Sequence, residues 1–164
     1  MEQYGAITEE IYQELLAAVG PGGVIMNDSE ALDNYAWDQA GRIWGHMPEA
    51  VVKPADTAQV SAVMKIASRE HIPVTPRGAG TGLSGGALPA WGGIVMSFEK
   101  MNRILELDEE NLTITTEPGV VTAEISRMAA QHGLLYAGDP CSGDASFIGG
   151  NVAENAGGNK VIKY

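Results

Sequence analysis

The sequence predicts an α+β fold with a mixed sheet, and two patterns carry this prediction. Residues 50–76 have the pattern of a β-α-β unit, in which a short apolar strand, an amphipathic helix and a second strand follow one another. Residues 104–116 contain two alternating runs around a short polar link, which is typical of a β-hairpin. Because a β-α-β unit pairs its strands in parallel and a hairpin pairs them antiparallel, we expect a mixed sheet.

The composition is that of a folded protein with an acidic balance. The 164 residues are 45% hydrophobic and 19% charged, which argues against disorder and is enough for one core or two small lobes. The formal net charge is −11 and no basic block offsets it. Because phosphate backbones are bound by clustered Lys and Arg, no nucleic acid is expected as a partner.

Targeting signals and metal-ligand patterns are missing from the sequence. Residues 1–10 lack the positive and apolar regions of a secretory signal, and no apolar run approaches the roughly 20 residues of a transmembrane segment. Cys141 is the one cysteine and forms no internal disulfide, so a cytoplasmic location is the default expectation. The histidines His46, His71 and His132 match no metal-ligand spacing, so we expect structural or surface roles and no metal.

The first elements can be placed from residue 8 onward. Residues 8–19 carry apolar side chains along one stripe of a helix, and residues 24–26 are apolar enough for a short strand. Asp28 and Ser29 are both candidate caps for a helical stretch through Leu32 and Tyr35. Residues 37–47 show no period and are expected to be irregular.

The β-α-β unit comes next along the chain. Residues 50–52 form its first, buried strand, and Asp56 is a good N-cap for its helix. The apolar positions that recur at helical spacing are Val60, Val63, Met64 and Ala67. Residues 72–75 form its second strand, and residues 94–98 are a third strand candidate.

The last third of the chain begins with the hairpin. Its strands are expected at residues 104–107 and 112–116, and we attribute the mixed character of the sheet to them. Thr122 is expected to cap a helix that runs to Gln131. Residues 138–158 then form a glycine-rich region with strong turn patterns.

A first glycine-rich segment, residues 76–86, follows the second strand directly. Glycine lets successive backbone N–H groups converge on one anion because no Cβ blocks the approach. Thr81 and Ser84 add hydroxyl donors for phosphate oxygens. The alternative is a flexible surface loop, but the segment follows a buried strand and lacks the Glu, Gln and Lys of linkers. The pattern therefore favours a phosphate-binding loop.

The kind of phosphate ligand depends on the residues that come after the glycines. Residues 80–85 match G-x-G-x-x-G, the dinucleotide fingerprint, which also requires a helix that begins within it. Pro89 and the glycines at 92–93 oppose such a helix and so argue against a nicotinamide-dependent Rossmann dehydrogenase. No Lys-Ser or Lys-Thr comes next, as a P-loop would require. The loop backbone itself is therefore expected to hold the phosphates.

The second glycine-rich region, residues 138–158, suggests the opposite wall of a cleft that holds an extended ligand. Ser146 is expected to cap a short helix there. Gly149 and Gly150 in that helix would allow close backbone contact with a flat ring.

Four pieces of sequence in this order resemble the FAD domain of the vanillyl-alcohol oxidase/PCMH flavoprotein superfamily. The closest similarity is to its glycolate oxidase and D-lactate dehydrogenase branch, and it runs from about residue 48 to residue 164. The four pieces are Pro54 with the helix after it, residues 76–86, residues 117–119 and residues 148–158.

The resemblance implies a PCMH-type FAD-binding domain of two small α/β subdomains, truncated at its C-terminal end, with FAD between them. The division that it implies has an N-terminal helical extension at 1–47, a first FAD subdomain at 48–100 and an incomplete second one at 101–164.

The same resemblance assigns the cofactor-binding residues. Those expected to wrap the pyrophosphate are Pro76, Arg77, Gly78, Ala79, Gly80, Thr81, Gly82, Leu83, Ser84, Gly85 and Gly86. Those expected along the path from adenine to isoalloxazine are Asp139, Pro140, Ser146, Gly149, Gly150 and Asn155. Some relatives attach FAD covalently through a histidine in the first loop, where this chain has Thr81, so noncovalent FAD is expected.

The activity that the resemblance implies is oxidation of a small 2-hydroxy acid, with hydride transfer to flavin N5. A separate substrate domain normally supplies the catalytic groups, so none is assigned here and the chain alone is not expected to turn over substrate. The implied partners are the 2-hydroxy acid, an electron-accepting protein or quinone, and other subunits in a homo- or hetero-oligomer. The alternative is a noncatalytic module that binds FAD or another nucleotide.

Overall fold

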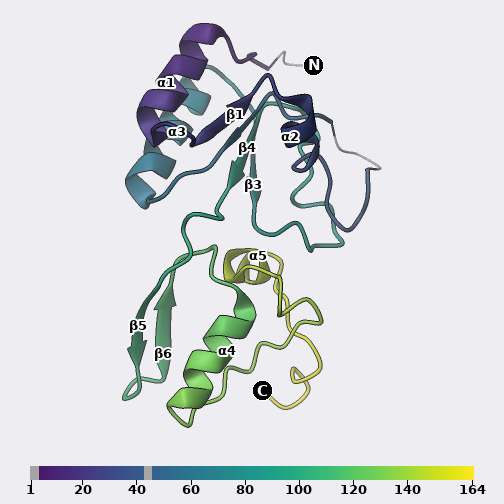
Figure 1. Cartoon of the computed structure of the whole chain (residues 1–164). Coiled ribbons are helices and arrows are strands. Elements are labelled where there is room, and N and C mark those ends of the chain that lie inside the picture. Colours follow the sequence, from purple (N-terminus) through teal and green to yellow (C-terminus); the bar gives the residue numbers. More distant parts are fainter. Residues whose placement is uncertain (1–3, 43–45) are drawn as a thin grey trace. The chain divides into compact units, whose positions relative to one another are not determined.

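The computed structural model describes residues 4–42 and 46–164, and the chain divides into two compact units at residues 1–100 and 101–164 (Figure 1). Part of the segment expected to be irregular, residues 43–45, lies outside the described residues. The elements of the first unit are α1 (Glu9–Val19), β1 (Val24–Met26), α2 (Ser29–Asp33), β2 (Ala50–Val52), α3 (Thr57–Arg69), β3 (Val74–Arg77) and β4 (Ile94–Ser97). Those of the second unit are β5 (Ile104–Asp108), β6 (Thr113–Thr116), α4 (Thr122–Gln131) and α5 (Ile148–Ala153).

Side-chain caps fix the beginnings of three helices in the first unit. Asp28 accepts a hydrogen bond from the N–H of Ala31 at 3.0 Å, and Asp56 accepts one from Gln59 at 2.8 Å. Thr8 plays the same part for α1, where its hydroxyl accepts from Ile11. Each cap satisfies a main-chain donor that the first helical turn would leave unpaired. The predicted cap at Asp56 is confirmed, and of the two candidates at 28 and 29 the cap is Asp28, because Ser29 is the first helical residue.

The four strands of the first unit form one mixed sheet in the order β1-β2-β4-β3. β2, β4 and β3 are parallel, whereas β1 pairs antiparallel with β2. The mixed sheet was predicted, but its origin was predicted wrongly, because β1 and not the hairpin supplies the antiparallel pair. The hairpin β5–β6 forms a separate two-stranded, antiparallel sheet in the second unit.

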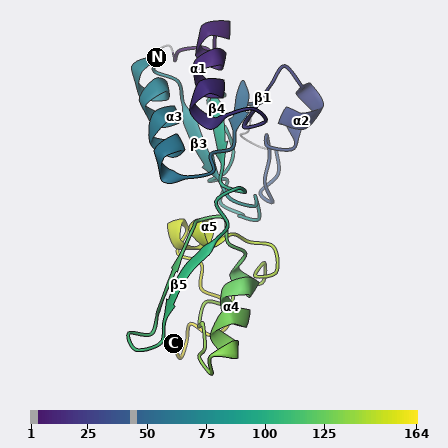
Figure 2. The same cartoon turned by 60° about the vertical axis from the view of Figure 1, so that its left-hand side comes forward.

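The sheet of the first unit has a helical layer on each face. α1 and α3 lie side by side on one face, and α2 lies on the other (Figures 1 and 2). Successive strand side chains point to opposite faces, so Val52 packs with α1 and α3 whereas Val51 packs with Leu32 of α2. The helix of the N-terminal extension thus contributes Leu15, which is fully buried, to the same core. The division of the chain into an extension and two FAD subdomains stays a prediction.

The buried face of α3 differs by one position from the predicted stripe. Met64 was expected in the core, but 44% of its surface is exposed. Ile66 is buried there instead, at 8% exposure, beside Val63 and Ala67. Each residue turns a helix by about 100°, which carries Met64 beyond the edge of the stripe centred on Val63.

β3 lies two residues further along than the strand expected at 72–75. Ile72 is buried in the core but precedes the strand, which ends at Arg77. Pro76 has no N–H for the ladder, and it is accommodated because β3 is the edge strand of the sheet. The strand therefore delivers Arg77 directly to the start of the glycine-rich loop.

The second unit places α4 alongside the hairpin (Figure 2). Its core consists of Val120, Ile125 and Ile148, with Ile104 and Ile114 of the two strands packed against them. Thr122 was expected to cap α4, but it is the first helical residue, and Val121 stands at the cap position without a side-chain bond. None of the helices in the described part of the chain is long and apolar enough to cross a membrane.

Replacement of Ile66 by alanine tests the corrected face of α3. We expect Ile66→Ala to lower the free energy of unfolding by about 2–5 kcal/mol because it leaves a cavity in the core. Met64→Ala is the matched control on the same helix and should cost less than about 1 kcal/mol. Urea unfolding followed by circular dichroism measures both, and equal losses for the two variants would contradict the assignment.

Candidate functional site

The first glycine-rich segment forms a loop between β3 and β4. Residues 78–93 are all described and contain no helix, as Pro89 and the nearby glycine pair predict. The far end of the loop is anchored, because Leu88 is buried and its N–H donates to the carbonyl of Gly85 at 3.1 Å. Leu83 at the tip is 77% exposed. The loop therefore has a fixed base and an accessible middle.

The middle of this loop presents main-chain donors without acceptors. Among the described residues, the N–H groups of residues 78–83 donate to no protein acceptor. Residues 78–82 are nonetheless partly shielded from solvent. Partly buried N–H groups need a partner, and successive free ones suit the oxygen atoms of a phosphate.

Arg77, at the base of the loop, has a buried side chain. It is 8% exposed, and its Nη2 donates to the carbonyl of Asn34 at 3.4 Å. Its guanidinium lies 5.7 Å from the ring centre of Tyr35. Burial lowers the pKa of Arg77, and the negative charge of Asp38 partly offsets this effect. Nη1 is buried without a hydrogen-bond partner in the described part of the chain.

The conformation of Gly80 follows from this buried guanidinium. Its φ of 72° lies in the left-handed region, which side chains other than glycine rarely adopt. An added Cβ would also collide with the guanidinium of Arg77. Position 80 therefore requires glycine for the fold of the loop.

A second set of charged residues, Lys53 and Glu99, lies just beyond the C-terminal ends of β2 and β4. Lys53 forms an ion pair with Glu99 at 2.7 Å, and the hydroxyl of Tyr35 donates to Glu99 at 3.0 Å. Burial disfavours the charged forms of Lys53 and Glu99, but their hydrogen bonds and opposite charges outweigh this effect. The pKa of Lys53 is therefore raised and the pKa of Glu99 is lowered. Lys53 and Arg77 thus both lie near the ring of Tyr35, and Glu99 accepts a hydrogen bond from its hydroxyl.

Sequence reasoning singled out neither Tyr35 nor Asp38 as a functional residue. Tyr35 was expected in a helical stretch, but α2 ends at Asp33, and Asp38 lies in a segment that shows no hydrophobic period. Asp38 is 2% exposed, and its Oδ2 is buried without a partner in the described part of the chain. The one available indication was an aspartate in a segment that ends in glycine, a pattern typical of turns.

In the second unit, Ser146 plays a different part from the one predicted. It was expected to cap α5, but Phe147 stands at that position and makes no side-chain cap. The hydroxyl of Ser146 faces inward and lies 3.1 Å from that of Thr122. Asn151 donates from its side-chain amide to both hydroxyls. This buried network ties α4 to α5, and Asn151 is a member that the sequence did not single out.

The glycines of α5 also divide in role. An added Cβ at Gly149 would lie 2.6 Å from the Cβ of Pro118, so this glycine is needed for packing within the unit. Gly150 is exposed, and a Cβ there would meet nothing within 4 Å. Asn155 is exposed just beyond the helix. Of these predicted contacts, Gly150 and Asn155 are free to meet a ligand.

Asp139 and Pro140 border a hollow of about 370 Å³ in the second unit. The side chain of Asp139 is paired with Lys160 at 3.1 Å, and its N–H donates to the carbonyl of Gly157. The hollow is lined by Thr122, Ala123, Ser126, Gly138, Asp139, Pro140, Cys141, Gly143, Asp144 and Asn159. The structure brings two of the six predicted residues of this unit into the hollow.

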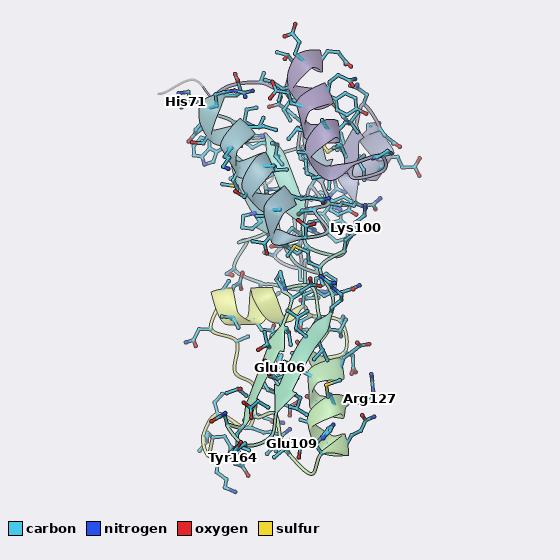
Figure 3. All side chains as sticks on the ribbon, turned by 90° about the vertical axis from the view of Figure 1, so that its left-hand side faces the viewer. His71, Lys100, Glu106, Glu109, Arg127 and Tyr164 are labelled. Carbon is cyan, nitrogen blue, oxygen red and sulfur yellow. The ribbon has the colours of Figure 1, made fainter. Side chains whose placement is uncertain are left out.

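The three histidines lie on exposed surface. His71 follows the end of α3, and Glu109 lies at the turn of the hairpin in the second unit (Figure 3). His132 pairs with Glu109 at 2.7 Å. Among the residues that the structure describes, no three His, Cys, Asp or Glu side chains gather as a metal site.

Comparison with known proteins identifies the family of the chain. Residues 48–164 match the model of the FAD binding domain, so the chain belongs to this family. Its fold is that of the PCMH-type FAD-binding domain, as predicted, and its cofactor is FAD. The solved alkyldihydroxyacetonephosphate synthase has the same fold, with a TM-score of 0.83 at 21% identity over 100% of this chain and 32% of that one.

Two curated relatives cover nearly all of this chain. Glycolate oxidase subunit GlcD of Bacillus subtilis is 41% identical over 96% of the chain and 33% of its own length. D-lactate dehydrogenase of Anaerostipes hadrus is 38% identical over 99% of the chain and 34% of its own length. The chain therefore spans about a third of the length of these relatives.

Proposed function

We propose that this chain is the FAD-binding part of a flavin-dependent oxidoreductase that oxidises a small 2-hydroxy acid. Its membership of the FAD-binding family supports the cofactor. The substrate class is supported by two relatives whose names specify glycolate and D-lactate, both of which are 2-hydroxy acids. Bound FAD would supply the acceptor of a hydride from the substrate carbon, at flavin N5.

One observation carries the proposal: the N–H groups of residues 78–83 have no protein acceptor among the described residues, and they follow a buried cation. A diphosphate bridge is anionic and offers many acceptor oxygens, so these donors fit it. Arg77 is the one charged residue among residues 76–86, so the loop itself carries no negative charge that would repel a phosphate. The donor set therefore suits the pyrophosphate of FAD.

The predicted residues of the second unit have a separate proposed role at the flavin and adenine parts of the cofactor. Gly150 and Asn155 are exposed, and Asp139 and Pro140 border a hollow, so these four can contact a ligand. Ser146 and Gly149 act indirectly, since both are engaged in packing and hydrogen bonds within the unit. Noncovalent attachment is proposed because Thr81 stands where some relatives carry the linking histidine.

The whole activity also depends on groups that we do not assign to this chain. We propose that the chain binds FAD without turning over substrate by itself, because it spans about a third of relatives that carry the activity names. A cytoplasmic location, an electron-accepting protein or quinone, and assembly with other subunits stay predictions. The alternative is a noncatalytic FAD-binding module. Its bound flavin would stay oxidised in the presence of substrate even after the rest of such a protein is added.

Replacement of Gly80 by alanine tests the loop as the cofactor site. The folded wild-type chain should bind FAD and not NAD in a calorimetric titration. Gly80→Ala should weaken FAD binding about tenfold or more, because the collision with Arg77 and the left-handed φ displace the loop.

Gly133→Ala is the matched control for backbone strain. Gly133 has a φ of 71° and open space around it, and it lies after α4 in the second unit. This variant should lose stability but keep wild-type FAD affinity. Equal loss of FAD affinity in both variants, or no FAD binding by folded wild-type protein, would contradict the proposal.

Anaerobic mixing with substrate tests the proposed reaction. The FAD-loaded chain alone should keep its flavin oxidised when glycolate or D-lactate is added. The flavin should be reduced when the remaining two thirds of a full-length relative, as a separate polypeptide, is also present. A bleached flavin in the chain alone would contradict the proposal that this chain binds FAD without turning over substrate. No bleaching in either mixture would favour the noncatalytic alternative. Absorbance of the flavin reports both outcomes.

A further inference from the structure

The segment of residues 34–41 precedes the region that matches the FAD-binding family, yet it supports the glycine-rich loop. Asp38 closes a tight turn in it. Its Oδ1 accepts the N–H of Ala40 at 2.8 Å, and its carbonyl accepts the N–H of Gly41 at 3.0 Å. The turn is fixed because both the side chain and the main chain of Asp38 hold it.

The turn is joined to the loop by one main-chain hydrogen bond. The N–H of Gln39 donates to the carbonyl of Gly80 at 3.2 Å. In a planar trans peptide, the carbonyl of one residue and the N–H of the next point in opposite directions. The bond from Gln39 therefore directs the N–H of Thr81 away from the turn, with no protein acceptor in the described part of the chain.

The guanidinium of Arg77 also lies beside Gly80, in the space that a Cβ at this position would occupy. That guanidinium is in turn fixed by the carbonyl of Asn34 and the ring of Tyr35, both from the same segment. Asp38 is the buried countercharge: it is 2% exposed, Arg77 is 8% exposed, and each has one buried atom without a partner in the described part of the chain. A buried cation without an anion nearby would be strongly destabilised.

We propose that Asp38 is a positioning residue that, through the Gln39–Gly80 bond and the buried Arg77, sets the orientation of the N–H groups that bind the pyrophosphate. This inference rests on the proposed function, because it concerns the same loop. It assigns to the segment before the FAD-binding family match an indirect effect on cofactor affinity, through the orientation of the loop. Asp38 itself contacts no cofactor in this account.

Two substitutions of Asp38 separate its two contributions. Asp38→Asn keeps an oxygen for the N–H of Ala40 but removes the charge, whereas Asp38→Ala removes both. We expect FAD affinity to fall about threefold in the first and about tenfold or more in the second. ADP, which carries the pyrophosphate without the flavin, should weaken by the same factors. Calorimetric titration of FAD and ADP into the 164-residue chain measures both.

Asp33→Asn is the matched control, because it makes the same chemical change five residues earlier in the chain. The Asp33 side chain forms an exposed ion pair with Arg42 at 2.6 Å, and in the described part of the chain it bonds to no residue of the turn at 38–41 or of the loop. This variant should bind FAD and ADP like the wild type. A merely structural role of Asp38 would lower the melting temperature without a selective loss of FAD and ADP by the folded fraction.

The outcomes distinguish this inference from the function on which it rests. Wild-type affinity in folded Asp38→Asn and Asp38→Ala would overturn the inference alone, as would a loss of FAD affinity without a loss for ADP. Failure of the folded wild-type chain to bind FAD would overturn the proposed function and this inference together. Should Asp38→Ala fail to fold, Asp38→Asn against Asp33→Asn decides the question.

Discussion

The buried guanidinium of Arg77 is the constraint around which the first unit builds its loop. Taking a cation out of water is costly unless nearby groups compensate it. Here a carbonyl, an aromatic ring and a buried carboxylate compensate, and all three come from residues 34–38. Because the guanidinium occupies the space beneath residue 80, only glycine fits there, and the left-handed turn at that residue opens the loop. The proposed cofactor-binding loop and the local fold thus depend on the same buried charge.

The proposed binding of an anion by the loop depends on main-chain donors that the fold of the loop leaves unused. Strands β3 and β4 pair in parallel, so the chain must leave the sheet between them, and the glycine-rich segment makes that connection without a helix. Its middle N–H groups consequently have no protein acceptor in the described part of the chain. The second unit behaves differently, because Ser146 and Gly149 are committed to packing and hydrogen bonds that tie α4 to α5. The first glycine-rich region therefore offers free main-chain donors, whereas the second uses Ser146 and Gly149 to pack its own unit.

Local patterns predicted most of the elements, and tertiary contacts account for the differences. The caps at Asp28 and Asp56 and the hairpin depend on neighbours in sequence, so they could be identified. The side on which Met64 lies and the partner of the Ser146 hydroxyl depend on the groups that pack against them. The glycine spacing and the family resemblance indicated the loop as a site. Asp38 had no comparable pattern, because its proposed role depends on the hydrogen bond from Gln39 to Gly80, which only the folded chain reveals.

Amide hydrogen exchange of residues 78–83, with and without saturating FAD, tests the central claim most directly. These N–H groups have no protein acceptor in the described part of the chain, so the account predicts fast exchange in the free protein. FAD should slow exchange at these residues, whereas the exposed hairpin turn at residues 109–112 should stay unchanged and serves as the internal control. Bound FAD with unaltered exchange throughout residues 78–83 would contradict the account.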